Sequence, residues 1–486
     1  MMIRSRFILL SFVIFGLILR LPSLFEPYWN SDEGVYLAVG QAIRRGFLVY
    51  KDIYDNKPPL LHLLAAVSTE QIHFRILAGV AVLLSLVFFF KICQKILPKN
   101  GIPVVLILYL LLTNLPLLEG NTGNAEMFFQ LTSLIGVYLL VRGSTSSATA
   151  KIFLGLSFGV GFLFKFHAVF DLFPLVVYQF FFYPEKPSIN IFRRFYDILP
   201  VLVGFLIPFS ISLVYYYLLG TQGFYLDAAF WGNLDYATRW GSSPISFLEK
   251  LSPSALSGRV IILVVVVLVL LYFKNKISKT EALVFLWFSF SLFAVLLSGR
   301  PYPHYIYQLV PSLCLVIYFL FKSEIFSRLL SGFLLGFLFI SIIKFNFYVY
   351  PVIGYYRNFY LFVTNQRSLD DYINHFNWND SRNIEIANFI KKNTSPDDKI
   401  YLAGDQPVIY ALADRRPAGS YLYQYQVFDF GKTDVLLAQF SSKPPKMVVV
   451  FRNEERFWRG FNELLASKYV LATSIGDASL YSSSNN

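Results

Sequence analysis

The sequence has few charged residues and few cysteines. Asp, Glu, Lys and Arg make up 15% of its 486 residues, against about a quarter in soluble proteins, which argues against a soluble globular chain. The two cysteines, Cys93 and Cys314, both lie in apolar runs and give no indication of a disulfide framework. Apolar residues are abundant instead: 56% of the chain is hydrophobic, 51 residues are phenylalanine, and the mean hydropathy is +0.53.

The apolar residues gather into long runs, and runs of about 18 or more residues are typical of membrane spans. We expect a polytopic α-helical membrane protein with about eleven spans. Their approximate ranges are 7–25, 75–97, 102–118, 126–142, 152–164, 166–183, 198–219, 259–273, 282–298, 305–321 and 329–350. No small-residue cleavage site follows the first run, so we expect a signal-anchor span there.

The net charge of +12 is concentrated in the first 350 residues, which hold 27 basic and 16 acidic groups. With the N-terminus on the inner side, the short inner loops carry 15 basic residues against four acidic ones. Such a bias reports membrane orientation, and it predicts a cytoplasmic N-terminus and an extracytoplasmic C-terminus. No basic domain with a nucleic-acid-binding pattern is present, so we expect no nucleic-acid partner.

Residues 351–486 differ from the rest because polar residues return and the spans stop. We expect helices and strands to alternate there, which predicts a small extracytoplasmic α/β domain after a transmembrane domain of residues 1–350. The helices are expected at 381–393, 406–413 and 454–467, and the strands at 399–403, 447–451 and 469–474.

Two outer loops are long, at about 26–74 and 220–258. The first contains two stretches, 34–46 and 58–67, that we expect to be helices lying at the membrane interface. The second is rich in aromatic side chains, which are interfacial anchors by default, with a sugar platform as the alternative. These are Tyr225, Trp231, Tyr236 and Trp240.

The segment 152–183 is too short for two full crossings, which need about 40 residues. Its turn, Lys165-Phe166-His167, is therefore expected below the outer membrane surface. An ionisable group at such depth is a functional candidate by default.

Three carboxylates are candidate catalytic groups. Asp32 and Glu33 lie just after the first span in an apolar, aromatic loop, and Glu126 stands at the outer start of a span. Carboxylates in poor solvent tend to have raised pKa values, which suits a general base. The alternative interpretation is that they are solvated loop charges.

Basic side chains are expected on the same side of the membrane: Lys57 before Pro58-Pro59, Lys165 at the hairpin turn, and Arg300 and His304 in a short loop. Several cations facing one leaflet favour binding of an anionic headgroup such as a phosphate. Taken singly, each is better explained as a snorkelling or interfacial anchor.

These segments, read in order, resemble membrane glycosyltransferases of the GT-C superfamily, in the bacterial branch related to protein O-mannosyltransferases and lipid A aminoarabinose transferase. The resemblance rests on Ser31-Asp32-Glu33-Gly34-Val35-Tyr36, Tyr50 to Leu60 with its Lys-Pro-Pro, Asn124-Ala125-Glu126, Phe164-Lys165, and Gly299 to Gln308. It covers residues 1–350 by motif, whereas the outer α/β domain matches by pattern only.

The resemblance implies a bacterial inner-membrane enzyme that moves a sugar from a polyprenyl-phosphate donor to an acceptor hydroxyl with inversion. Asp32 is then the general base, and Glu33 and Glu126 position the acceptor or, with Asp32, hold a divalent metal such as Mg²⁺ or Mn²⁺. The resemblance assigns binding of the donor phosphate to Lys57, Lys165, Arg300, His304 and Tyr305. The acceptor, a lipid, a glycan or a protein, is left open.

Two other function classes remain open on sequence alone. A transporter or flippase of lipid-linked glycans also needs many spans and buried charges, although the related halves typical of transporters are not visible. A non-catalytic scaffold would use residues 351–486 to bind a partner.

Overall fold

The computed structural model describes residues 2–143, 147–182, 191–233, 255–377, 379–452 and 460–484. These residues form two compact units. Unit 1 contains Met1–Leu21, Ile76–Leu218 and Phe230–Val352, and unit 2 contains Pro22–Arg75, Leu219–Ala229 and Ile353–Asn486. The division differs from the predicted domains 1–350 and 351–486, because the first long loop groups with the C-terminal residues.

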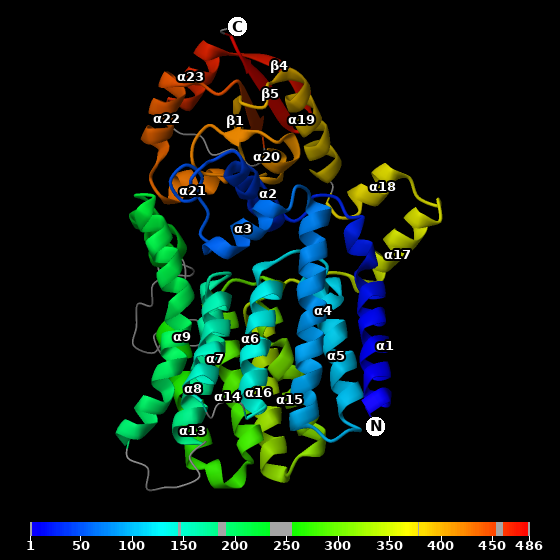
Figure 1. The fold of residues 1–486 in the computed structure, drawn as a ribbon. Helices are drawn as coiled ribbons and strands as arrows, with labels where there is room; N and C mark the ends of the chain where they lie inside the picture. Colours follow the sequence, from blue (N-terminus) through cyan, green and yellow to red (C-terminus); the bar gives the residue numbers. More distant parts are fainter. Residues whose placement is uncertain are drawn as a thin grey trace. The chain divides into compact units, whose positions relative to one another are not determined.

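Each of the eleven expected spans contains an apolar helix (Figure 1). The helices are α1 Met2–Arg20, α4 Gln71–Ile96, α5 Ile102–Asn114, α6 Ala125–Val141, α7 Ala148–Phe162, α8 Val169–Phe181, α9 Ile191–Leu218, α13 Leu256–Tyr272, α14 Lys279–Leu296, α15 Val310–Lys322 and α16 Ile325–Lys344. Within the described ranges, six segments are long and apolar enough to cross a membrane, and the others are shorter. The chain is a polytopic α-helical membrane protein, as the composition predicts.

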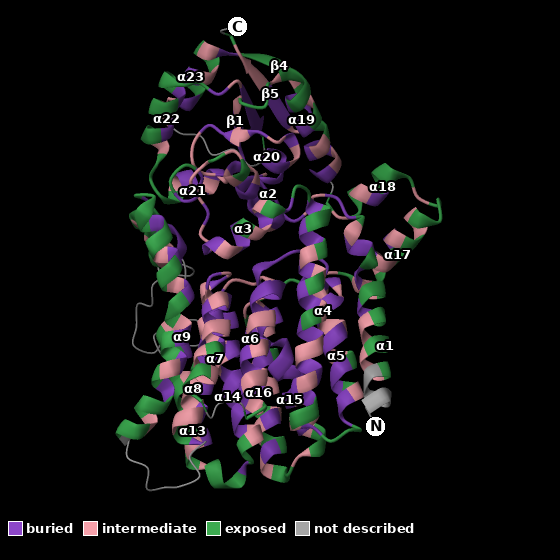
Figure 2. Cartoon of the chain, viewed as in Figure 1, coloured by how far each residue is buried: buried purple, intermediate pink, exposed green. Residues whose placement is uncertain are grey.

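Burial separates central helices from peripheral ones in unit 1. In the span Lys279–Leu296, 78% of residues are buried, whereas in Phe192–Leu218 only 28% are. Figure 2 shows exposed residues along α9 and along the part of α1 whose burial is described. Large apolar side chains on these surfaces, such as Ile211 and Leu218, are stable only against lipid, because in water they would form a large unpaired apolar patch.

Helices α7 and α9 pack closely because glycines line their contact. A Cβ atom added to Gly155 would lie 1.9 Å from the carbonyl oxygen of Val201, and one added to Gly204 would lie 2.0 Å from that of Ile152. Small residues allow such close backbone approach between membrane helices. The contact fixes α7, and with it the turn that follows this helix.

The hairpin of α7 and α8 is short, as expected. With 15 and 13 residues, the two helices are only about 20 Å long each, less than the roughly 30 Å of a hydrocarbon core. The turn between them contains the short helix η3, Phe166–Ala168, and Lys165 and His167 in this turn are buried.

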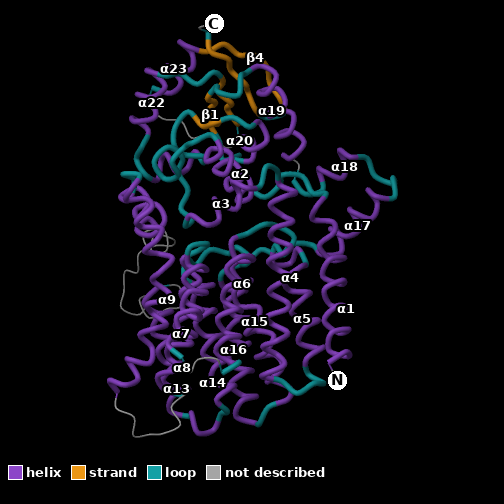
Figure 3. The backbone as a smooth tube through the Cα atoms, viewed as in Figure 1, coloured by secondary structure: helices purple, strands orange, loops and turns teal. Residues whose placement is uncertain are grey.

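Unit 2 contains a five-stranded sheet, drawn in orange in Figure 3. Its strand order is β2-β1-β3-β5-β4, in which β1 pairs parallel with both β2 and β3, while β5 is antiparallel to both β3 and β4. The strands are β1 Lys399–Ala403, β2 Arg416–Pro417, β3 Met447–Phe451, β4 Tyr469–Ile475 and β5 Ala478–Ser483. The predicted α/β domain is present, and β1 and β3 have the predicted bounds.

The remaining helices of unit 2 surround this sheet or precede it in the chain. They are α2 Ser31–Arg44, α3 Pro59–Val67, α10 Gln222–Leu226, α17 Val352–Val363, α18 Leu369–Asn374, α19 Asn379–Asn393, α20 Val408–Ala413, α21 Gln424–Asp429, α22 Thr433–Ser442 and α23 Phe461–Lys468. The expected helix 454–467 is described from residue 460 onward, and its earlier part lies outside the described residues.

The helices expected in the first long loop are present as α2 and α3, but α2 is covered by protein. A Cβ atom added to Gly34 would lie 2.6 Å from Val408 Cγ1 on α20, and the Gln41 side chain donates to the carbonyl of Ala411 at 2.9 Å. Arg45 forms an ion pair with Asp414 at 2.8 Å. These contacts, about 370 residues apart in sequence, explain why residues 22–75 belong to unit 2.

Candidate active site

The first turn of α2 holds the predicted acidic pair. Asn30 caps the helix, and its side chain accepts a hydrogen bond from the Glu33 amide at 3.0 Å. The helix dipole favours carboxylates at this end. The two neighbours nevertheless differ in environment, because Asp32 is half-buried whereas Glu33 is fully buried.

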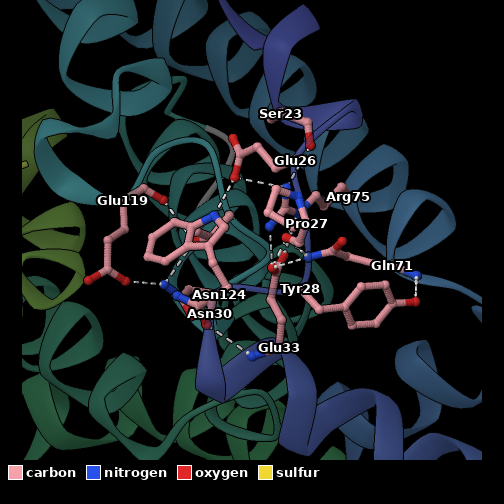
Figure 4. A network of polar contacts seen from close by, with 12 residues as sticks. Ser23, Glu26, Pro27, Tyr28, Asn30, Glu33, Gln71, Arg75, Glu119 and Asn124 are labelled. Atoms are coloured by element: carbon pink, nitrogen blue, oxygen red, sulfur yellow. Dashed lines mark hydrogen bonds and ion pairs between the residues drawn. The ribbon is translucent and has the colours of Figure 1, made fainter. Parts of the chain in front are cut away.

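Glu33 belongs to a buried ion-pair network centred on Arg75, drawn in Figure 4. The Arg75 guanidinium donates to Glu33 Oε1 at 3.0 Å through Nε and to Oε2 at 2.6 Å through Nη2. Gln71 donates to the same carboxylate at 3.1 Å. A carboxylate held in this bidentate way is fixed in both charge and position.

Glu26 is the second carboxylate of this network. Its Oε2 lies 2.9 Å from Arg75 Nη1, and Tyr355 and Trp29 donate hydrogen bonds to it. The network therefore ties the first long loop to α17, through Tyr355. Burying three charges is costly unless they are paired and hydrogen-bonded, as they are here.

Asp32 forms no ion pair or hydrogen bond through its side chain with any residue that the structure describes. The pKa of Tyr423 is raised mainly by burial of its phenol, and the negative charge of Asp32 raises it further. Asp32 is thus the half-buried carboxylate of the pair, whereas Glu33 is fully buried.

The Lys-Pro-Pro segment lies in the same unit. Pro59 occupies the first turn of α3, where its fixed φ suits a helix start. The Lys57 ammonium donates to Asn56 Oδ1 at 2.9 Å, and its carbonyl accepts from the Tyr50 hydroxyl at 2.8 Å. Lys57 is half-buried and held at both its backbone and its side chain.

A buried histidine on α3 stands beside this lysine. His62 Nε2 lies 3.4 Å from Asp55 Oδ2. Burial is the largest influence on the pKa of His62 and lowers it, although Asp55 acts in the opposite direction. Burial thus favours the neutral imidazole of His62.

In unit 1, Glu126 and Lys165 form a buried ion pair between the start of α6 and the hairpin turn. The Lys165 ammonium also lies 4.2 Å from the centre of the Tyr305 ring, a cation–π distance. Three residues predicted from the sequence are therefore in contact, although they come from three separate segments.

His304 completes this cluster through a residue that the sequence analysis missed. Its Nδ1 lies 2.9 Å from Glu119 Oε2, and Asn124 donates to the same oxygen at 2.9 Å. Glu119 adopts a left-handed conformation, with φ of 54°. Arg20 donates to the carbonyls of Gly120 and Thr122 and so supports this segment from α1.

The helix η6, Pro303–Leu309, presents His304 and Tyr305 and is fixed by two glutamines. Gln130 donates to the carbonyl of Tyr307 at 2.6 Å, and Gln308 donates to the carbonyl of His167 at 3.1 Å. Arg300, before this helix, is half-buried, and its amide donates to Ser298 Oγ at 3.4 Å.

The predicted residues are divided between the two units: Asp32, Glu33 and Lys57 lie in unit 2, and Glu126, Lys165, Arg300, His304 and Tyr305 lie in unit 1. The sequence analysis missed Arg20, Arg75 and Glu119. All three are charged residues at the ends of apolar segments, and a charge at such a position is the sequence feature that could have identified them.

The aromatic residues of the second long loop do not form one described platform. Tyr225 is fully buried against Tyr50, at 5.4 Å between ring centroids, which is a core position. Trp231 is 60% exposed. Tyr236 and Trp240 lie outside the described residues.

Two of the three carboxylates considered as metal ligands, Glu33 and Glu126, face cations instead. Glu126 is paired with Lys165, and Glu33 with Arg75. In the described part of the chain, no group of three or more His, Cys, Asp or Glu side chains has an arrangement able to hold a metal ion. Because Glu33 and Glu126 are held by these cations, neither carboxylate is free to bind a divalent metal.

Comparisons with known proteins bear on the family resemblance and on the fold. The family model for dolichyl-phosphate-mannose-protein mannosyltransferases matches residues 56–215, which include the Lys-Pro-Pro segment, Glu126 and Lys165. A search of curated protein sequences found no significant match.

Solved structures share the fold at low sequence identity. ArnT from Cupriavidus metallidurans, bound to undecaprenyl phosphate, superposes with a TM-score of 0.58 at 13% identity over 97% of each chain. Its apo form gives the same values. An oligosaccharyltransferase from Archaeoglobus fulgidus gives 0.48 at 11% identity, over 92% of this chain and 69% of its own.

The partial family match and the shared fold confirm the resemblance predicted from the sequence. The chain has the fold of a GT-C membrane glycosyltransferase, with a small C-terminal sheet domain. Family and fold together indicate a glycosyltransferase of the multi-pass membrane class.

Proposed function

We propose that the chain transfers a sugar from a polyprenyl-phosphate donor to an acceptor hydroxyl, with inversion at the anomeric carbon. The observation that carries the proposal is the contrast in the first turn of α2, where Glu33 is locked on Arg75 and Asp32 is left half-exposed. The proposal is supported by the fold of ArnT, which was crystallised with undecaprenyl phosphate.

Asp32 acts as the general base. Its carboxylate takes the proton of the acceptor hydroxyl while that oxygen attacks the anomeric carbon. The bond from this carbon to the phosphate oxygen breaks, and polyprenyl phosphate leaves with the bonding electrons. One displacement of this kind inverts the anomeric configuration. A positioned base of this type contributes about 10²–10⁴-fold to a rate.

Cationic side chains stabilise the charge that develops on the leaving phosphate. Lys57 in unit 2, and Lys165, Arg300 and His304 in unit 1, are assigned to this role, with the Tyr305 ring supporting Lys165. Preorganised charges of this kind usually give the largest catalytic contribution. Because Glu126 is already paired with Lys165, we assign it to holding that ammonium in place.

We assign Glu33 to positioning the acceptor rather than to proton transfer, because Arg75 and Gln71 already donate hydrogen bonds to its carboxylate. No step is routed through a metal. We further propose that the protein lies in a bacterial inner membrane, with its N-terminus in the cytoplasm and residues 351–486 outside the cytoplasm, following the distribution of basic residues.

The test is sugar transfer from a polyprenyl-phosphate donor in membranes that contain the protein. Asp32→Asn is expected to lower turnover by roughly 10³-fold, because the amide cannot accept the proton. Asp52→Asn is the matched control, since Asp52 lies in the same loop, is exposed and only accepts the Leu48 amide. Thermal unfolding of both variants is expected to match that of the unmodified protein.

Near-normal turnover in Asp32→Asn would exclude Asp32 as the base. A flippase is the second candidate, favoured by the several charged groups buried among the apolar helices of unit 1. Translocation of the intact lipid-linked glycan with no glycosyl product would establish that alternative in place of transfer.

A further inference from the structure

A row of alternating tyrosines follows β2 in unit 2. Tyr421, Tyr423 and Tyr425 are each half-buried. The residues that alternate with them are buried: Leu422, Gln424 and Gln426. Tyr421 and Tyr423 precede helix α21, and Tyr425 lies in the first turn of that helix, where its ring centroid is 5.1 Å from that of Tyr423.

The tyrosine row, Tyr421–Tyr425, lies at the carboxyl edge of the parallel strands. Asp405 follows the end of β1, and its carboxylate accepts a hydrogen bond from the Tyr425 amide at 3.0 Å. The strand order places β2 and β3 on opposite sides of β1. In open α/β sheets, ligands bind at the carboxyl edge where connections leave to opposite sides.

The same edge is reached by the start of α2. Gly34 lies against Val408, at the beginning of the helix that follows β1. The phenol of Tyr423 consequently lies within electrostatic range of Asp32, and also of Asp55 and Asp405. The row is therefore close to the carboxylate assigned as the base.

Two further rings extend the aromatic surface. Tyr54 lies 5.1 Å from the Tyr421 ring and 5.2 Å from that of Phe430, measured between centroids. The Tyr54 amide donates to the carbonyl of Ser420 at 2.7 Å, which joins the first long loop to the row. The charge of Asp227 also reaches Tyr54 and Tyr421.

We propose that this surface binds the acceptor and that the acceptor is a neutral glycan. A pyranose has an apolar face of C–H groups, which packs on a phenol ring, and hydroxyls at its edge, which donate to carboxylates. The charged side chains that reach the row are carboxylates, Asp32, Asp55, Asp227 and Asp405, so an anionic polymer is repelled.

The donor is a poorer occupant of this surface, because its phosphate needs cations. This inference rests on the proposed function only in taking Asp32 as the base, since the attacking hydroxyl must lie beside that group. It assigns Tyr421 and Tyr423 to acceptor specificity and leaves the residues proposed for the donor phosphate unchanged.

Binding is measured directly on the purified full-length chain in detergent, without any donor. Saturation-transfer NMR with cellohexaose, mannohexaose and maltohexaose is expected to show magnetisation transfer to at least one of the three. Tyr421→Ala and Tyr423→Ala are expected to weaken that binding about tenfold each, the size of effect seen when a buried aromatic anchor is truncated.

Two control variants separate stacking from folding. Tyr421→Phe keeps the ring and is expected to bind as the unmodified protein does. Tyr360→Ala removes a tyrosine that is 59% exposed on α17 and is expected to change nothing. The proposal is overturned if none of the three oligosaccharides receives magnetisation, or if the two alanine variants, correctly folded, bind as well as the unmodified protein.

Asp32→Asn distinguishes this inference from the proposed function. That variant is expected to keep oligosaccharide binding while it loses transfer. Binding with no transfer by the unmodified protein contradicts the proposed function alone. Transfer with an unchanged acceptor KM in Tyr421→Ala contradicts the acceptor surface alone.

Discussion

The two units arrange their candidate charges in different ways. In unit 1, Glu126 and Glu119 each face a basic side chain, Lys165 and His304, and all four are buried. In unit 2, the adjacent carboxylates of α2 differ: one is locked in an ion-pair network, and Asp32 is left half-exposed. A buried pair fixes geometry, whereas an accessible carboxylate is able to exchange a proton with a substrate.

The difference separates residues that hold the structure from residues that react. Breaking a buried pair leaves an uncompensated charge and mainly costs stability. Removing an accessible carboxylate mainly costs rate, as proposed for Asp32. Four substitutions, taken from the largest expected effect to the smallest, test the buried charges and the packing on which this comparison rests.

The largest loss of stability is expected for Arg75→Met. It leaves Glu26 and Glu33 buried without their common cation, and breaking one buried pair already costs about 3–5 kcal/mol. Arg357→Met, an exposed change on α17, is the control. The measurement is thermal unfolding of purified protein in detergent, and equal melting of the two variants would contradict a structural role for Arg75.

Lys165→Met is expected to destabilise unit 1 by about 3–5 kcal/mol, because Glu126 is left charged and buried. Adding Glu126→Gln removes that charge and is expected to restore most of the stability. Transfer activity is expected to stay low in the double variant, since the ammonium is still missing. If the double variant is as unstable as Lys165→Met, the unpaired charge of Glu126 is not the cause of the lost stability.

Gly34→Ala tests the packing that brings Asp32 to the sheet edge. The new Cβ would meet Val408 Cγ1 at 2.6 Å and its Cα at 2.8 Å, so the backbone must shift. Overpacking of this kind costs about 1–3 kcal/mol. Gly223→Ala, where nothing lies within 4 Å, is the control. If both variants melt alike, α2 does not pack on α20 as described.

The smallest effect concerns Asp380, a buried carboxylate whose Oδ2 has no hydrogen-bond partner among the described residues. Burial raises its pKa from 3.8 to about 7. The folded state therefore binds more protons than the unfolded state between these values, and stability falls as the pH rises through that window.

Asp380→Asn mimics the protonated acid and is expected to melt slightly above the unmodified protein at pH 4.5 and further above it at pH 7.5. Unfolding temperatures measured across this range check the expectation, with Asp397→Asn as the exposed control. A constant difference between Asp380→Asn and the unmodified protein would mean that Asp380 does not titrate in this window.

The helices and the central strands were predictable because their signals are local. Apolar runs identify each membrane helix, and the buried run Met447–Phe451 identifies β3. The edge strand β2 has only two residues, and β5 has a mostly polar sequence, so neither carries a clear pattern.

The partners of the candidate residues were less predictable. Glu33 and Arg75 are 42 residues apart, and Glu119 and His304 are 185 apart. A single sequence holds no signal for contacts of this range. It identified Asp32 and Glu33 as a pair, but only the packing of the loop on Arg75 shows that the two carboxylates have different environments.

The most direct test of the account is the fate of the donor lipid. Purified protein in liposomes is supplied with a polyprenyl-phosphate sugar and a soluble oligosaccharide, and the lipids and glycans are followed by mass spectrometry. We expect polyprenyl phosphate to accumulate while the oligosaccharide gains the mass of one sugar, and neither change to occur with Asp32→Asn. A donor that stays intact, or that only crosses the bilayer, would contradict the account.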